Sequence, residues 1–218
     1  MTEVQWLMFL PQLPSSPSSL RVLVWRRLRA AGALGLQHGV WVLPQRPEHE
    51  RFLSNLVAEI QPQGGNGLLL RAHPLQADLS DTIVERFRAE RDEEYRELRG
   101  RCADFLEEIV NETASRNFTF AELEENEQDL QKLASWLSKI LARDFCGASQ
   151  AEPSKRDLTL CQEALEQFAQ AVYNQAGLVD STEGMPTPRQ SDEVNAGRAN
   201  RTSSIEETTE SGEVERGR

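Results

Sequence analysis

Short apolar runs and segments of helical periodicity alternate within residues 1–76 of this 218-residue chain. The apolar runs are WLMFL, ALGLQ, VWVLP and GLLLRAH, and the helical segments cover residues 15–32 and 47–63. The resulting order is β-α-β-β-α-β, which is typical of the ferredoxin-like, split βαβ arrangement. We therefore predict an α+β fold that begins with a ferredoxin-like domain over residues 1–76.

The first helical segment combines an apolar face with a basic one. Its apolar side chains recur at helical spacing and predict the buried face; they are Leu20, Leu23, Val24, Leu28 and Ala31. Arg21, Trp25, Arg26 and Arg29 lie on the opposite face, with Arg27 beside them. We predict that Arg21, Arg26, Arg27 and Arg29 contact DNA phosphates. The alternative is that these arginines form a solvated face or pair with the acidic helices that follow.

After residue 76 the periodicity becomes continuously helical and predicts a helical extension over residues 77–176. The first helix of the extension has an apolar stripe that includes Ile83, Phe87, Glu94, Leu98, Cys102, Phe105 and Ile109, with Tyr95 beside it. Thr119 and Glu122 form a capping box that starts the second helix. The third helix is predicted over residues 158–175.

Residues 177–218 contain no aromatic residue and few apolar ones. Such a segment cannot bury enough apolar surface to offset the entropy of ordering it. We predict a disordered acidic tail.

Charge is distributed unevenly along the chain, whose formal net charge is −11. Residues 1–78 hold seven arginines and five acidic residues, whereas the remainder holds 17 basic and 30 acidic residues. An acidic region repels phosphate, so any nucleic-acid contact is expected within the first 78 residues.

The sequence offers no recognisable catalytic or metal-binding pattern. Cys102, Cys146 and Cys161 lack ligand spacing and are expected to be reduced thiols. His38, His49 and His73 have no paired ligand and are expected to be exposed or capping residues. We predict a non-enzymatic protein without metal or cofactor.

No apolar run is long enough to span a bilayer, and no leader pattern precedes a cleavage site. We expect a cytoplasmic protein that has no membrane partner.

Three segments together resemble the N-terminal region of the ChrB family. They are LRVLVWRRLRAAGALGLQHGVWVLP, ERFRAERDEEYRELRGRCADFLEEI and ELEENEQDLQKLASWLSKILARDFCG, and the resemblance covers roughly residues 5–148. Members of that family are described as transcriptional regulators of chromate-efflux operons. Their second, C-terminal domain is associated with handling chromate, and the resemblance implies that a tail replaces it here.

Two functions follow from the residues and the resemblance. The first is a dimeric DNA-binding transcriptional regulator of a chromate-resistance or metal-stress operon, whose ferredoxin-like domain and basic helix help to hold the operator. The alternative is a non-catalytic interaction or assembly module derived from the ChrB N-terminal region.

The strands are apolar at consecutive positions, so both faces of the sheet should be buried, whereas two helices cover only one. Either the helical extension or a second copy must cover the other face. We predict a homodimer in which Trp6, Met8, Trp41 or their neighbours lie near the contact.

Overall fold

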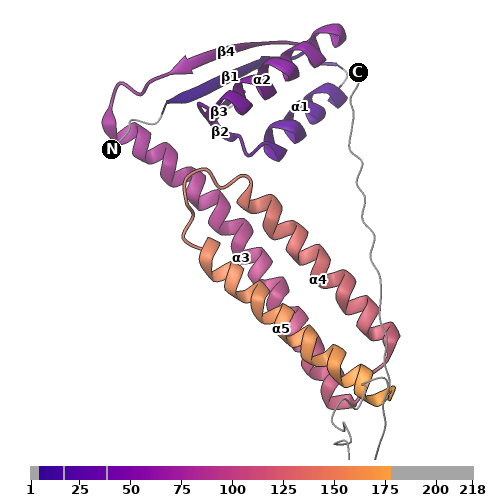
Figure 1. Cartoon of the computed structure of the whole chain (residues 1–218). Helices are drawn as coiled ribbons and strands as arrows, with labels where there is room; N and C mark the ends of the chain where they lie inside the picture. Colours follow the sequence, from indigo (N-terminus) through magenta and orange to yellow (C-terminus); the bar gives the residue numbers. More distant parts are fainter. Residues whose placement is uncertain (1–4, 17, 38, 178–218) are drawn as a thin grey trace, which may run out of the picture. The chain divides into compact units, whose positions relative to one another are not determined.

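Strands and helices alternate along the first part of the chain (Figure 1). The strands are β1 (Trp6–Gln12), β2 (Leu34–Gln37), β3 (Val40–Pro44) and β4 (Asn66–Ala72). Helix α1 (Ser18–Ala30) follows β1, and α2 (Pro47–Ile60) follows β3 and continues into the 3-10 helix η1 (Gln61–Gln63). The computed structural model describes residues 5–16, 18–37 and 39–177. His38 and the predicted disordered tail after Gly177 lie outside the described residues.

The four strands form one antiparallel sheet in the order β2-β3-β1-β4. In register, Met8 of β1 lies between Val42 of β3 and Leu70 of β4, and Leu10 lies opposite Leu68. Residues directly opposite in an antiparallel pair project from the same face of the sheet. The fold therefore combines an N-terminal antiparallel sheet with helices, as the mixed α+β class requires.

One face of the sheet is covered by α1 and α2 (Figure 1). The strands contribute Leu7, Phe9 and Leu43 to this core. The helices and the loop after α1 contribute Leu20, Val24, Leu28, Ala33, Leu53, Leu56 and Ile60. Each of these residues is almost completely buried, so this face of the sheet forms a continuous apolar core.

The opposite face of the sheet is covered only in part. Trp6, Leu34 and Val42 are buried against Ile83 and Phe87 of helix α3 (Ala77–Ser115). The rings of Trp6 and Phe87 stack with their centroids 5.6 Å apart. The chain's own helix thus supplies part of the cover that the apolar strands require.

No described helix supplies such cover for the remainder of that face. Leu68 and Leu70 of the edge strand β4 are each 49% exposed, and the adjacent Met8 and Leu10 are half-buried. Of the residues predicted to lie near a contact with a second copy, Trp6 is buried by α3. Trp41 packs against the core on the α1 and α2 face, and the contact with a second copy stays a prediction.

The remaining helices, α4 (Phe120–Leu141) and α5 (Ala151–Gln175), pack along α3 (Figure 1). Their shared core includes Tyr95, Leu98, Cys102, Phe105, Ile140, Cys161 and Phe168. The predicted cap is present, because the Thr119 hydroxyl accepts a hydrogen bond from the backbone N–H of Glu122. Helix α5 begins earlier than the predicted Leu158, because Pro153 falls in its first turn, where a missing N–H is tolerated.

Three side chains are placed differently from the sequence prediction. Tyr95 is fully buried, whereas Glu94, assigned to the apolar stripe, is half-buried in an ion pair. His49 is buried rather than exposed, and its Nδ1 lies 2.7 Å from the Pro44 carbonyl oxygen. This carbonyl gives the ring a partner and makes burial of the polar imidazole tolerable. His73 is exposed, as expected.

Within the described residues, no helix combines the length and the apolar character needed to cross a membrane.

Two glycines provide a matched test of this packing. A Cβ added at Gly67 would lie 2.4 Å from the Phe9 ring, whereas one added at Gly100, within α3, meets nothing within 4 Å. We expect Gly67→Ala to lower the free energy of unfolding by about 1–3 kcal/mol through overpacking. Gly100→Ala should raise it by about 1 kcal/mol through helix propensity.

Guanidinium-induced unfolding followed by circular dichroism measures both changes. Equal effects of the two substitutions would contradict the close packing of Phe9 on β4.

Candidate functional site

The predicted DNA-contacting arginines of α1 have different surroundings. Arg21 donates hydrogen bonds from Nη1 to the backbone carbonyls of Pro14, at 3.0 Å, and of Ser15. It therefore holds the loop between β1 and α1. Arg27 is exposed and its Nη2 lies 2.6 Å from Glu59 Oε2 on α2.

Arg29 points toward the helical extension. Its Nη1 lies 2.6 Å from Oε2 of Glu90 on α3, in a partly buried ion pair. Arg26 is exposed and makes no side-chain hydrogen bond or ion pair within the part of the chain that the structure describes. Of the four predicted arginines, Arg26 has the fewest competing contacts.

The outer surface of α1 also carries large apolar side chains. Trp25 is 54% exposed and Val22 is 44% exposed. Val22 lies one helical turn before Arg26, and Trp25 lies one turn after Val22 and directly precedes Arg26 in the sequence. Helix α1 contains no acidic residue in its first turn and has Arg27 and Arg29 in its last turn. We call Val22, Trp25 and Arg26 the α1 surface. An aromatic ring beside a free guanidinium can stack on a planar group while the cation contacts an anion.

Sequence reasoning missed a buried arginine on α3. Arg91 of α3 is 2% exposed, and its Nη2 is 3.0 Å from Glu94 Oε1 and 3.4 Å from Glu90 Oε2. Its Nε and Nη1 are buried without a hydrogen-bond partner among the described residues. Burial lowers the pKa of the Arg91 guanidinium, an effect that Glu94 opposes.

The same cluster joins three parts of the chain. Glu90 also pairs with Arg29 of α1, and Glu94 also pairs with Arg143, which follows α4, at 2.8 Å. Arg143 Nη1 lies 3.5 Å from the backbone oxygen of Arg29. We call these five residues the Arg91 cluster. The helical spacing of Glu90 and Glu94 could have pointed to a common face, but nothing local indicates that Arg91 is buried.

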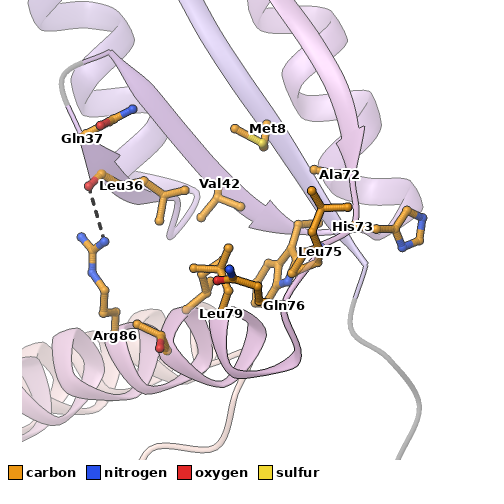
Figure 2. A pocket seen from close by; sticks show the side chains of 14 residues that line it. Met8, Leu36, Gln37, Val42, Ala72, His73, Leu75, Gln76, Leu79 and Arg86 are labelled. Carbon is orange, nitrogen blue, oxygen red and sulfur yellow. Dashed lines mark hydrogen bonds between the residues drawn. The ribbon is translucent and has the colours of Figure 1, made fainter.

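A cavity of about 590 Å³ lies between the partly covered face of the sheet and the beginning of α3 (Figure 2). Figure 2 shows Met8 and Val42 on the sheet side of the cavity and Gln76 and Leu79 across from them. The lining is mainly apolar. Its members are Trp6, Met8, Leu36, Gln37, Val42, Ala72, His73, Pro74, Leu75, Gln76, Leu79, Thr82, Ile83 and Arg86.

Two polar groups of the cavity wall have distinct roles. Arg86 donates from Nη2 to the Gly35 carbonyl at 2.6 Å and from Nη1 to the Leu36 carbonyl at 3.4 Å, the latter drawn in Figure 2. These bonds join α3 to the edge strand β2. Trp6 is 1% exposed, and its indole Nε1 is buried without a hydrogen-bond partner among the described residues.

The thiols occupy structural positions. Cys102 and Cys161 are buried between α3 and α5, where the Cys161 Sγ lies 3.5 Å from the Cys102 carbonyl oxygen. A hydrogen bond from Cys161 lowers the pKa of the Cys102 thiol, and the same interaction raises the pKa of Cys161. Burial raises the pKa of Cys146. Among the described residues no group of three or more His, Cys, Asp or Glu side chains is arranged to hold a metal ion.

Comparison with known proteins places this fold in a family. Residues 21–179 match the family described as Protein ChrB, N-terminal, and the chain therefore belongs to that family. It is similar to Protein ChrB of Cupriavidus metallidurans, with 27% identity over 115 residues. That alignment covers 53% of this chain and 32% of the relative, so the chain matches about a third of the relative's length. The resemblance predicted from three sequence segments is confirmed.

Proposed function

We propose that this protein is a DNA-binding transcriptional regulator of the ChrB type, which acts in the cytoplasm on a chromate-resistance or metal-stress operon. Membership of the ChrB N-terminal family supports the class of function. The observation that carries the DNA-binding part is the α1 surface, where Arg26 has no competing carboxylate among the described residues and Trp25 is 54% exposed. A guanidinium in this setting can contact a phosphate without first breaking an ion pair.

The other predicted arginines support this contact in different ways. Arg27 is exposed at the end of α1, but a phosphate must compete with Glu59 for it. Arg21 and Arg29 have structural partners, and their contribution to DNA binding is chiefly to hold α1 and its electrostatic field in place. We therefore propose that Arg26 contributes more to DNA affinity than any of the other three.

The proposed regulator has a ferredoxin-like N-terminal domain and is a homodimer. The antiparallel order β2-β3-β1-β4, with α1 and α2 on one face, supports the ferredoxin-like assignment. The incompletely covered sheet face supports the dimer. Met8, Leu10, Leu68 and Leu70 make an uncharged apolar patch on it, which we call the open patch. In an acidic chain, an uncharged patch is where two copies can meet with little charge repulsion.

The second candidate function is a protein-interaction or assembly module without DNA binding. The open patch also favours this function, because apolar side chains that are half-exposed on a sheet are typical of protein contacts. DNA binding distinguishes the two candidates, whereas dimerisation is compatible with both.

The DNA-binding proposal predicts a graded effect of the α1 arginines. In gel-shift titrations on the DNA upstream of the protein's own gene, Arg26→Ala should weaken binding more than Arg27→Ala, because Arg27 is already paired. Loss of one phosphate contact should reduce the slope of log K against log salt by roughly 1. The titrations are repeated at two salt concentrations.

Arg96→Ala is the matched control, since Arg96 is an exposed arginine of α3 that pairs within its own helix. This control should leave binding unchanged. If the wild-type protein forms no salt-sensitive complex with this DNA, the regulator proposal is contradicted and the assembly module is favoured. If Arg26→Ala leaves DNA binding unchanged, the α1 surface is not the DNA contact.

The dimer proposal predicts that charge on the open patch separates the subunits. Light scattering at micromolar concentration should give a mass near twice 24.6 kDa for the wild type and near 24.6 kDa for Leu68→Glu/Leu70→Glu. Val110→Glu on α3 is the control, because Val110 is 64% exposed but lies away from the sheet. A monomeric wild type, or dissociation by Val110→Glu alone, would contradict the assignment of the open patch.

A further inference from the structure

Trp6, one of the residues that line the cavity beside α3, carries an indole N–H donor that has no hydrogen-bond partner among the described residues. The Trp6 side chain is buried under α3, where it stacks on Phe87, yet its Nε1 has no acceptor among the described residues. A buried N–H without a partner costs free energy, and indole N–H groups in protein interiors usually have an acceptor. An acceptor supplied from outside the chain would satisfy it.

The volume and the lining of the cavity suit a small apolar molecule. Its volume of about 590 Å³ is within the range typical of sites for small molecules. Met8, Leu36, Val42, Leu79 and Ile83 supply apolar surface from both the sheet and α3. Leu79 is 45% exposed and Leu75 is fully exposed, so apolar side chains at the mouth would be covered by a bound molecule.

The charges around the cavity indicate which charge the polar end of a bound molecule should carry. Arg86 is the lining residue that carries a permanent charge, and its Nε is not engaged in the bonds that Nη1 and Nη2 make to β2. His73 also lines the cavity, but Figure 2 shows its ring directed away from the other labelled side chains. No carboxylate is among the described residues of the lining, although the chain has 35 acidic residues against 24 basic ones.

Asp78, Asp81 and Glu85 belong to the same turns of α3 but are not part of the lining. The described residues of the wall therefore supply one permanent cation and one unsatisfied N–H donor but no carboxylate. We infer that this cavity binds a small apolar carboxylate, whose hydrocarbon body packs between the sheet and α3 and whose oxygens accept hydrogen bonds from Arg86 and Trp6. This inference does not depend on DNA binding.

Decanoate, decanol and decylammonium are suitable probes, because they share one hydrocarbon chain and differ in the charge of the head group. Isothermal titration of the full chain, below the concentrations at which the probes aggregate, should show saturable binding of decanoate. Decanol should bind about tenfold more weakly or worse, since it lacks the charge that Arg86 recognises, and decylammonium should not bind measurably.

Three substitutions locate the site. Arg86→Met keeps an apolar stem but removes the cation and should weaken decanoate binding about tenfold or more, while leaving decanol binding nearly unchanged. Trp6→Phe keeps a ring against Phe87 but removes the N–H, and should weaken decanoate binding by roughly fivefold. Thr82→Trp fills the cavity from an exposed position of α3 and should abolish binding even if Trp6→Phe fails to fold.

Arg96→Met is the control for charge removal, because Arg96 lies on α3 outside the cavity lining and should leave decanoate affinity unchanged. Absence of saturable decanoate binding overturns the inference. Equal affinity for the three probes overturns it as well, because it indicates non-specific apolar association. If Arg86→Met and Thr82→Trp both leave decanoate binding intact, decanoate binds outside this cavity, and the inference is contradicted in that case too.

Discussion

The position of α3 relative to the sheet depends on a buried charge. Arg91 is 2% exposed, and the two glutamates that neutralise it, Glu90 and Glu94, are themselves shared with Arg29 and Arg143. Transferring a guanidinium from water to this site is costly, and its ion pairs recover that cost only in good geometry. Displacing any one partner would leave charge buried and uncompensated. The Arg91 cluster therefore favours one arrangement of α1, α3 and the segment after α4 over its alternatives, whatever its net contribution to stability.

This arrangement has direct consequences for the surfaces that carry the proposed functions. The pair between Arg29 and Glu90 fixes the end of α1, which leaves Trp25 and Arg26 facing outward. On the other side of the sheet, the stacking of Phe87 on Trp6 sets how much of the sheet α3 covers. The cavity and the open patch lie where that cover ends. One geometric relation thus determines the α1 surface, the cavity and the open patch together.

Much of the secondary structure could be predicted from the sequence because it depends on local signals. Hydrophobic periodicity indicated every helix, and the capping box located the start of α4 at Thr119. What covers the second face of the sheet could not be predicted, because consecutive apolar residues show that cover is needed but not which element supplies it. The sequence therefore left the helical extension and a second copy as alternatives, and the structure places Ile83 and Phe87 on part of that face.

The candidate sites were harder to predict than the fold. The basic face of α1 was recognisable, but the partners of Arg27 and Arg29 are distant in the chain and no local pattern identifies Glu59 or Glu90. Arg91 was missed for a similar reason, since arginine is seldom buried and its neighbours in sequence are acidic. The cavity also depends on tertiary contacts. Trp6 was expected near a subunit contact because an apolar strand does not reveal which of its residues a later helix will cover.

The central claim is that the sheet and the three-helix extension fold as one cooperative unit. It can be tested most directly by urea unfolding of a Trp136→Phe variant, in which the remaining tryptophans, Trp6, Trp25 and Trp41, all lie in the N-terminal part. Tryptophan fluorescence then reports on that part, while ellipticity at 222 nm is dominated by α3, α4 and α5. The account predicts coincident transitions with the same midpoint and slope. Separate midpoints for the two signals would contradict it, because they would show that α3 is not held against the sheet by the Arg91 cluster and the Trp6 stack.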